Sequence, residues 1–418
     1  MKKLFAIVLA LAMALSLAAC GSSSGSSSAS QSGSASAGSS TPTKLTLILR
    51  GGTYADVIKA ALPAFEAENN VTCEVLDLAF DDLHSKIALD AVNSQGAYDL
   101  CMVDGSWMAE FTANNVLANL SEMGYSFDDD IIPETTSICK VNNDIYLAPY
   151  FGNVTVMLYN KQLLADAGLT ADQLTTWDSV MKVAQSANAA GKKGFLIRGG
   201  SPDNIVSDFI PQLLSHGGWV VDSNNKPTVD TPEFKAAMKD YLALYKLGDT
   251  MDKDDIVAAI DNGDAAMGIG WPGWYVPTAD SKASYTVIPT KLNDSDSAKK
   301  TSMYGVWTVG IPNNSQNKEL ALKLLEYIMS PEVQLASVDN GGVPCRFSVL
   351  QNKDVLAKYP QLEIVCNALQ SGVYRPVIEQ WNDFTTILGT EMDNIIQGTK
   401  TIDQGLKDAQ SQLDTLMA

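Results

Sequence analysis

The segment KLTLILRGGT (residues 44–53) joins a short apolar run to a glycine-rich turn, and this combination decides the fold class. The apolar run, 44–49, predicts a buried strand, and the turn leads into a helical pattern. A second strand is predicted over 71–78, a helix over 83–92 and a third strand over 98–103. This alternation of strands and helices predicts a mainly parallel sheet with helices packed on its faces.

Polar and aromatic residues follow the ends of these three strands. Thr53 comes after the first strand, Asp81 after the second, and Asp104 and Trp107 after the third. In open α/β sheets, ligands bind beyond the carboxyl ends of the strands. We therefore expect these side chains along one rim, where they can hold a small ligand without any catalysis.

The first 20 residues predict export and attachment of a lipid. Lys2 and Lys3 precede an apolar run, 4–17. Its length of about 14 residues suits a signal peptide and is short for a membrane span, which needs roughly 20. The run ends in LAAC (17–20), which resembles the lipobox of bacterial lipoproteins. We expect a signal peptide over 1–19 and a diacylglycerol on the Cys20 sulfur; an ordinary signal peptide with a chance cysteine is the alternative.

Residues 20–43 predict a tether between this anchor and the folded part. The stretch 21–40 is almost entirely glycine, serine and alanine, which cannot nucleate a core. A coil of about 20 such residues spans roughly 25 Å. We see no later apolar run of about 18 residues. The protein is therefore expected at the outer face of the cytoplasmic membrane, in contact with it only through the lipid.

Length, charge and cysteine content limit the classes of protein. The formal net charge of −19 repels phosphate backbones, so nucleic acid is not an expected partner. Roughly 375 residues follow the tether, too many for one core, and they predict two lobes. An odd set of cysteines at wide spacing favours small buried thiols, with one disulfide as the alternative. These cysteines are Cys73, Cys101, Cys139, Cys345 and Cys366.

A series of fragments along nearly the whole exported chain resembles the signature of extracellular solute-binding protein family 1. This family includes the maltose-binding-like proteins of carbohydrate ABC importers. Each fragment is weak alone, and their common order carries the resemblance. The fragments are DIYLAPY (144–150), LYNK (158–161), AGL (167–169), TWD (176–178), WPGW (271–274), WTVGIP (307–312), SPE (330–332), GGVP (341–344) and RPVIEQW (375–381).

The resemblance implies a two-lobed α/β fold of the type II periplasmic-binding-protein class, with hinge-linked mixed sheets flanked by helices. The solute is then held in the cleft between the lobes. We expect the first lobe to comprise 44–149 and 304–340, and the second 150–303 and 341–418. The hinge would consist of three crossings, near residues 150, 303 and 341.

Aromatic candidates for the cleft come from the tryptophans. A sugar has an apolar ring face and a rim of hydroxyls, so its site needs flat aromatic rings together with hydrogen-bonding groups. The resemblance puts Trp107, Trp271, Trp274 and Trp307 near the cleft, with core packing as the alternative for each. Trp381 is a further candidate.

Polar candidates are carried over by position. Asp104 follows the third strand, and Arg346 follows the last crossing. Tyr150, at the first crossing, and Asn153, just after it, are candidates as well. Asp208 is also a candidate, with a carboxylate on a helix surface as its alternative.

Motifs for catalysis, cofactors or metals do not assemble. The sequence GIGWPG (268–273) matches G-x-G-x-x-G, but the tryptophan and proline after its second glycine obstruct the helix that a dinucleotide site needs. His84 and His216 lack the H-E-x-x-H spacing, and the acidic clusters lack EF-hand spacing. We expect no enzyme activity, no cofactor and no bound metal.

The sequence thus predicts a monomeric substrate-binding lipoprotein. It would capture a sugar or oligosaccharide and deliver it to the transmembrane subunits of an ABC permease. A binder of another solute, such as a peptide, polyamine or metal, is the alternative. A surface glycosidase is a more distant one, because it needs two carboxylates about 5–10 Å apart.

Overall fold

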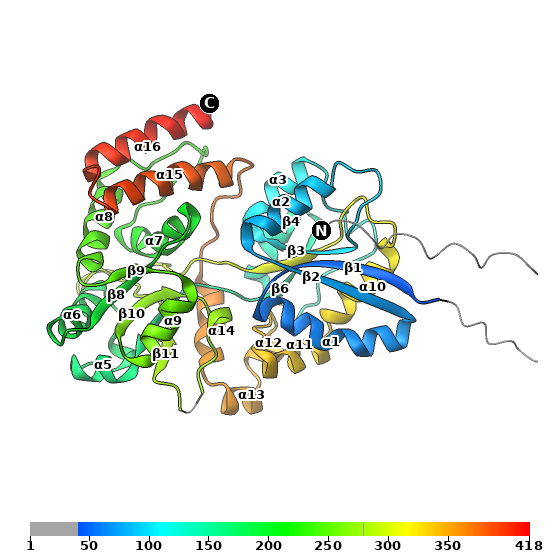
Figure 1. Cartoon of the computed structure of the whole chain (residues 1–418), viewed down its shortest axis with the longest axis horizontal. Helices are drawn as coiled ribbons and strands as arrows, with labels where there is room; N and C mark the ends of the chain where they lie inside the picture. The colour runs from blue at the N-terminus through cyan, green and yellow to red at the C-terminus, as the bar shows by residue number, and fades with distance from the viewer. Residues whose placement is uncertain (1–40, 279) are drawn as a thin grey trace, which may run out of the picture. The chain divides into compact units, whose positions relative to one another are not determined.

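The computed structural model describes residues 41–278 and 280–418 (Figure 1). The predicted signal peptide, Cys20 and the tether as far as residue 40 lie outside the described residues. Residues 42–418 form one compact unit. Most of its strands belong to two five-stranded sheets, which have the orders β2-β1-β3-β12-β6 and β11-β7-β10-β8-β9.

The first sheet contains the three strands predicted from the sequence. They are β1 (Thr43–Arg50), β2 (Val71–Leu78) and β3 (Leu100–Asp104), and they run parallel. Two strands from later in the chain, β12 (Trp307–Gly310) and β6 (Leu147–Phe151), complete the sheet in antiparallel orientation. The sheet is therefore mixed, as expected.

Helices cover both faces of the first sheet. Figure 1 shows α2 and α3 on one side of it and α1 and α11 on the other. Their bounds are α1 (Thr53–Asn69), α2 (Phe80–Asp90), α3 (Met108–Ala113) and α11 (Pro331–Ser337). Because α1 and α2 each follow a strand directly, their first residues lie at the carboxyl ends of β1 and β2.

The second sheet has the same mixed character. Strand β10 runs parallel to β8 and antiparallel to β7, while β9 and β11 form its edges. The strands are β7 (Val156–Asn160), β8 (Lys193–Arg198), β9 (Asp249–Met251), β10 (Ala265–Gly270) and β11 (Ala283–Thr286). The helices that pack around this sheet include α6 (Trp177–Ala189), α7 (Pro202–His216), α8 (Pro232–Tyr245), α9 (Lys253–Asn262), α15 (Trp381–Ile396) and α16 (Ile402–Leu416).

Segments that connect the two sheets lie side by side. Val154 bridges to Tyr304, and Met303 bridges to Val373. The Gly152 amide also bonds to the Val343 carbonyl at 2.5 Å. The crossings expected near 150 and 303 fall within these segments, and their assignment as lobe boundaries stays a prediction. The third was expected near 341, and the chain lies beside the other two at both 343 and 373.

The stretch between these two points contains α12 (Phe347–Leu350), α13 (Lys353–Lys358) and α14 (Gln361–Ser371). Val349 and Leu362 from these helices belong to the same hydrophobic cluster as the first sheet. The side chains of α15 and α16 belong to the other cluster, with the second sheet. The assignment of all of 341–418 to the second lobe stays a prediction.

The cysteines of the described chain are free thiols, in line with the sequence-based expectation. Cys101, Cys139, Cys345 and Cys366 are buried, and Cys73 is partly buried. Burial raises the pKa of Cys101 to about 12 and the pKa of Cys73 to about 11. These thiols are therefore protonated at neutral pH.

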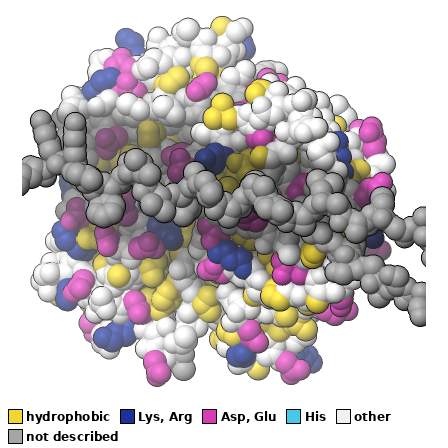
Figure 2. Space-filling view, turned by 45° about the vertical axis from the view of Figure 1, so that its right-hand side comes forward, with side chains coloured by type: hydrophobic (Ala, Val, Ile, Leu, Met, Phe, Trp, Pro, Cys, Tyr) yellow, Lys and Arg dark blue, Asp and Glu magenta, His cyan; other side chains and the backbone are white. Residues whose placement is uncertain are grey.

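Charged side chains of both signs are mixed over the face of the molecule drawn in Figure 2. The excess of acidic residues is spread among basic ones there. Among residues 41–278 and 280–418, no helix has both the length and the apolar character needed to cross a membrane.

Candidate ligand-binding cavity

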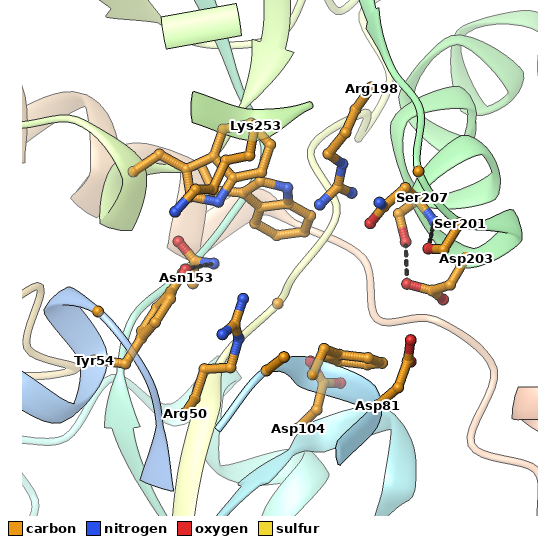
Figure 3. Close-up of a pocket in the computed structure, with 18 of the residues that line it drawn as sticks. Arg50, Tyr54, Asp81, Asp104, Asn153, Arg198, Ser201, Asp203, Ser207 and Lys253 are labelled. Atoms are coloured by element: carbon orange, nitrogen blue, oxygen red, sulfur yellow. Dashed lines mark hydrogen bonds between the residues drawn. The ribbon is translucent and has the colours of Figure 1, made fainter. Parts of the chain in front are cut away.

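A cavity of about 660 Å³ lies where strand ends of the two sheets face each other (Figure 3). On the first sheet, Arg50 ends β1, Asp104 ends β3 and Trp307 begins the antiparallel β12. On the second sheet, Arg198 ends β8 and Trp271 follows β10. The cavity therefore occupies the position that the strand order of an α/β protein predicts for a ligand.

Asn153 connects the two sides of this cavity. Its side-chain Nδ2 donates to the Tyr54 hydroxyl at 3.2 Å, and its Oδ1 accepts from the Gly273 amide at 3.4 Å. Tyr54 belongs to α1 beside the first sheet, whereas Gly273 follows β10 of the second sheet. Burial raises the pKa of Tyr54 to about 12, against the opposing effect of Arg50 and Arg198. Tyr54 therefore keeps its proton and can donate a hydrogen bond.

Arg198 is held in place by a ring and a carboxylate. Its guanidinium lies 5.0 Å from the centre of the Trp274 ring, within the range of a cation–π contact. Its Nη2 also lies 2.8 Å from the Asp208 Oδ1. Burial raises the pKa of Asp208 to about 6, although Arg198 opposes this shift. Asp208 does not line the cavity itself; it holds the Arg198 side chain, which does.

Arg375 forms a second buried ion pair in the cavity wall. Its Nη2 lies 2.7 Å from the Asp104 Oδ1, and its Nη1 lies 3.9 Å from the Asp203 Oδ1. Asp203 is the second residue of α7, and burial raises its pKa while Arg375 opposes the change. One guanidinium therefore lies near two carboxylates, one from the end of β3 and one from α7 beside the second sheet.

A polar link between α2, α3 and α15 also joins groups from the two sides. His84 Nε2 lies 2.8 Å from the Glu110 Oε2. The Asn382 Nδ2, near the start of α15, lies 3.1 Å from the same histidine nitrogen and 3.4 Å from the Glu110 carboxylate. His84 is partly buried and lies where α2 contacts α3 and α15.

Residues 35–335 match the family described as Bacterial extracellular solute-binding protein. The chain belongs to this family. The match confirms the resemblance carried by the ordered fragments, and it assigns this solute-binding protein to the binding components of ABC transporters.

Curated relatives of the solute-binding protein are distant but similar in length. A probable amino-acid ABC transporter periplasmic-binding protein of Sinorhizobium fredii is 22% identical over 387 residues, covering 90% of this chain and 89% of the relative. An arabinooligosaccharide-binding protein of Bacillus subtilis is 22% identical over 298 residues, covering 67% of each chain.

Solved structures establish the fold of the solute-binding protein. Maltose-bound MalE3 of T. maritima superimposes with a TM-score of 0.79 at 23% identity, covering 90% of this chain and 100% of that one. A solute-binding protein of Agrobacterium radiobacter in complex with ribitol gives a TM-score of 0.80 at 22% identity, covering 90% and 98%. The two-lobed, type II fold predicted from the sequence is thereby confirmed.

Half of the candidate ligand-binding residues line the cavity of the solute-binding protein. They are Asp81, Asp104, Asn153, Trp271, Trp274 and Trp307. The two acidic residues lie at strand ends of the first sheet, as expected, and the tryptophans of the second sheet follow β10. Whether these side chains contact the solute stays a prediction.

The structure does not bring three of the aromatic candidates to the cavity. Trp107 is 1% exposed, and the Phe80 ring, 4.9 Å away, lines the cavity next to it. Tyr150 is 2% exposed, near the end of β6. Trp381 begins α15 and stacks on Phe384. Core packing, the alternative considered for tryptophans, accounts for these positions.

Three polar candidates also lie away from the cavity lining. Arg346 is buried against the Met329 carbonyl and pairs with Asp128 at 2.7 Å, which gives it a structural role. Asp208 lies behind Arg198 and is buried, unlike the exposed helix carboxylate considered as its alternative. Thr53 precedes Tyr54, which takes the lining position at this point of α1.

Sequence reasoning missed several side chains that line the cavity. They are Arg50, Tyr54, Arg198, Asp203 and Arg375. Two of them carried a signal in the sequence, because Arg50 and Arg198 each stand before two glycines, in RGGT (50–53) and RGGS (198–201). Each arginine is the last residue of a strand, one in each sheet.

A metal site is not formed by the described part of the chain. Residues 41–278 and 280–418 hold no group of three or more histidine, cysteine, aspartate or glutamate side chains that could bind an ion. The glycines of GIGWPG end β10 and enter a single 3-10 turn, Pro272–Trp274, so no helix follows them to bind a pyrophosphate.

Proposed function

We propose that this solute-binding protein captures a sugar or oligosaccharide in the cavity between its two sheets and delivers it to an ABC permease. The observation that carries the proposal is the composition of the cavity wall. Trp271, Trp274 and Trp307 lie beside carboxylates and an amide. Flat rings cover the apolar face of a sugar, and polar groups replace the water lost by its hydroxyls.

The relatives support a carbohydrate ligand. Their names include binding proteins for arabinooligosaccharide, mannitol and diacetylchitobiose. Solved structures of similar fold hold maltose, α-D-tagatose or D-mannitol. These ligands differ in size but share a rim of hydroxyl groups.

The proposed mechanism is closure of the cavity around the solute. A ligand that contacts Tyr54 on one side and Trp274 on the other gains both contacts only when the two sides approach, so it favours the closed state. The permease would then recognise the closed state and open it. The affinity has to be moderate for release, and a micromolar dissociation constant corresponds to about −8 kcal/mol.

Isothermal titration calorimetry tests the ligand class. The protein carrying Cys20→Ser would be titrated with monosaccharides, alditols and oligosaccharides, and with peptides, polyamines and metal salts. We expect micromolar binding of at least one carbohydrate. Saturable binding of a peptide, polyamine or metal with no response to any carbohydrate would exclude a sugar importer. Incubation with the bound oligosaccharide should give no hydrolysis products, which separates the protein from a glycosidase.

We also propose that the protein is a monomer held at the outer face of the cytoplasmic membrane by a lipid on Cys20. Growth with radiolabelled palmitate should label the intact protein and leave the Cys20→Ser variant unlabelled. Equal labelling of both would place the lipid elsewhere. Light scattering of the Cys20→Ser protein should give the mass of one chain.

A further inference from the structure

Four charged residues of the cavity wall lie in two groups of opposite sign. Figure 3 shows Arg50 and Arg198, from opposite sides of the cavity, with their guanidinium groups directed toward the space between them. Asp81 and Asp203 also come from opposite sides, and their carboxylates lie together at another part of the cavity. The cavity therefore has a cationic end and an acidic end.

The cationic end has a charge without a carboxylate partner. Arg50 donates to the Leu78 carbonyl at 3.2 Å, and within residues 41–278 and 280–418 it forms no ion pair. Arg198 shares its charge with Asp208, but its Nε is buried and has no hydrogen-bond partner in the part of the chain that the structure describes. Both guanidinium groups can therefore donate hydrogen bonds to an anionic group placed between them.

The acidic end has more carboxylates than cations. Arg375 lies 2.7 Å from Asp104, which leaves Asp203 at 3.9 Å from the same guanidinium. Asp203 accepts a long hydrogen bond, 3.4 Å, from the Ser207 hydroxyl. Asp81 forms no hydrogen bond or ion pair with the part of the chain that the structure describes. Asp104 and Asp203 therefore share one guanidinium, and Asp81, whose carboxylate lies near that of Asp203, adds a further negative charge (Figure 3).

Closure around an uncharged sugar would take Arg50 and Asp81 away from water without an opposite charge for either of them, and would leave Asp203 with only a distant guanidinium. Burial of an unpaired charge is costly. A ligand with one charge of each sign would satisfy both ends at once and would also be fixed in a single orientation.

We propose that the solute is zwitterionic, with an acidic group bound between Arg50 and Arg198 and a protonated amino group bound by Asp81 and Asp203. This inference rests on the proposed carbohydrate function, and within it the ligand class is an amino sugar that also carries a carboxylate. The aromatic rings of the cavity then contact the sugar ring between the two charged groups.

Calorimetry with four related sugars tests the charge of the ligand. Muramic acid carries both groups, glucosamine only the amine, glucuronate only the carboxylate, and glucose neither. At pH 7 and low salt we expect muramic acid to bind at least tenfold tighter than each of the others. Glucose binding as tightly as muramic acid, or more tightly, would overturn the proposal of a zwitterionic ligand and leave the carbohydrate function intact.

Charge-neutral variants assign each end. Arg50→Gln should weaken muramic acid and glucuronate at least tenfold and leave glucosamine unchanged, whereas Asp203→Asn should weaken muramic acid and glucosamine and leave glucuronate unchanged. Asp254→Asn is the matched control, because Asp254 lies at the same cavity but its side chain is 90% exposed. Equal loss for all ligands in Arg50→Gln or Asp203→Asn would overturn the assignment, and thermal melting would verify that each variant is folded.

Lysine and γ-aminobutyrate, amino acids that carry charges of both signs without a sugar ring, separate the two proposals. Binding of these amino acids with no response to any carbohydrate would retain the charge inference and exclude the carbohydrate function. The absence of binding by sugars and amino acids alike would overturn both.

Discussion

Arg375 Nη2 lies 2.7 Å from Asp104 Oδ1, and this buried pair connects the segment before α15 to the end of β3. The same Asp104 oxygen accepts from the amide and the hydroxyl of Ser106, at 2.9 and 2.7 Å. The carboxylate is therefore fixed by three donors. Its position in the cavity wall depends on a residue 271 positions later in the chain.

Arg375→Gln should destabilise the protein strongly, because it leaves Asp104 buried without its ionic partner. The expected loss in the free energy of unfolding is about 3–5 kcal/mol, the usual cost of breaking one side of a buried pair. Urea denaturation measures it. In the Asp104→Asn background the same substitution should cost much less, and identical costs in both backgrounds would contradict the pairing.

Trp274→Ala should weaken carbohydrate binding by roughly 10- to 100-fold, because it removes a ring that lines the cavity and supports Arg198. Calorimetry measures the loss. Trp177→Phe is the matched control, since Trp177 Nε1 donates to the Ser215 hydroxyl at 2.7 Å, away from the cavity lining. This control should lower the melting temperature and leave the affinity unchanged. Weaker binding by Trp177→Phe, together with unchanged binding by Trp274→Ala, would contradict the roles given to both tryptophans.

Asp208 should make the stability depend on pH between about 4 and 7. Burial raises the pKa of Asp208 from its ordinary value of 3.8 to about 6, so in this window the folded protein holds a proton that the unfolded chain has released. Its contribution is fully present below pH 3.8 and is lost as the pH rises through 6. The shift corresponds to about 3 kcal/mol.

Asp208→Asn removes this titration and provides the reference. The free energy of unfolding of the natural protein, minus that of the variant, should fall by about 2 kcal/mol between pH 4 and pH 7. Urea denaturation at several pH values gives this difference. A constant difference across the range would show that Asp208 titrates normally.

Arg346→Met should reduce stability without changing affinity. The guanidinium donates to the Met329 carbonyl at 3.0 Å and pairs with Asp128 and Asp130, so its removal leaves a buried carbonyl without its donor. We expect a loss of about 1–3 kcal/mol. An altered dissociation constant for the solute, with unchanged stability, would show that Arg346 takes part in ligand binding.

The sequence was sufficient for the fold because the strands are marked by local patterns. The apolar run at 44–49 and the strand at 71–78 gave β1 and β2 nearly to the residue, and the ordered fragments gave the family. The third crossing was harder, since α12, α13 and α14 lie between two points where the chain meets the other crossings.

The cavity was predicted only in part, for a physical reason. Trp107 and Trp307 both pack against the Phe80 ring, but only Trp307 lines the cavity, and this difference depends on packing between separate elements. Arg375 was missed because no local pattern indicates a partner on β3. Arg50 and Arg198 were more accessible to sequence reasoning, because each ends a strand before two glycines.

The protonated state of the native cysteines allows selective chemical labelling. Maleimides react with thiolates, so Cys101 and Cys73, with pKa values of about 12 and 11, should react slowly at neutral pH. A cysteine introduced at Asn382, beside His84 and Glu110, would then carry an environment-sensitive fluorophore without removal of the native thiols. In the Cys20→Ser protein, such a label would turn solute capture into an optical signal.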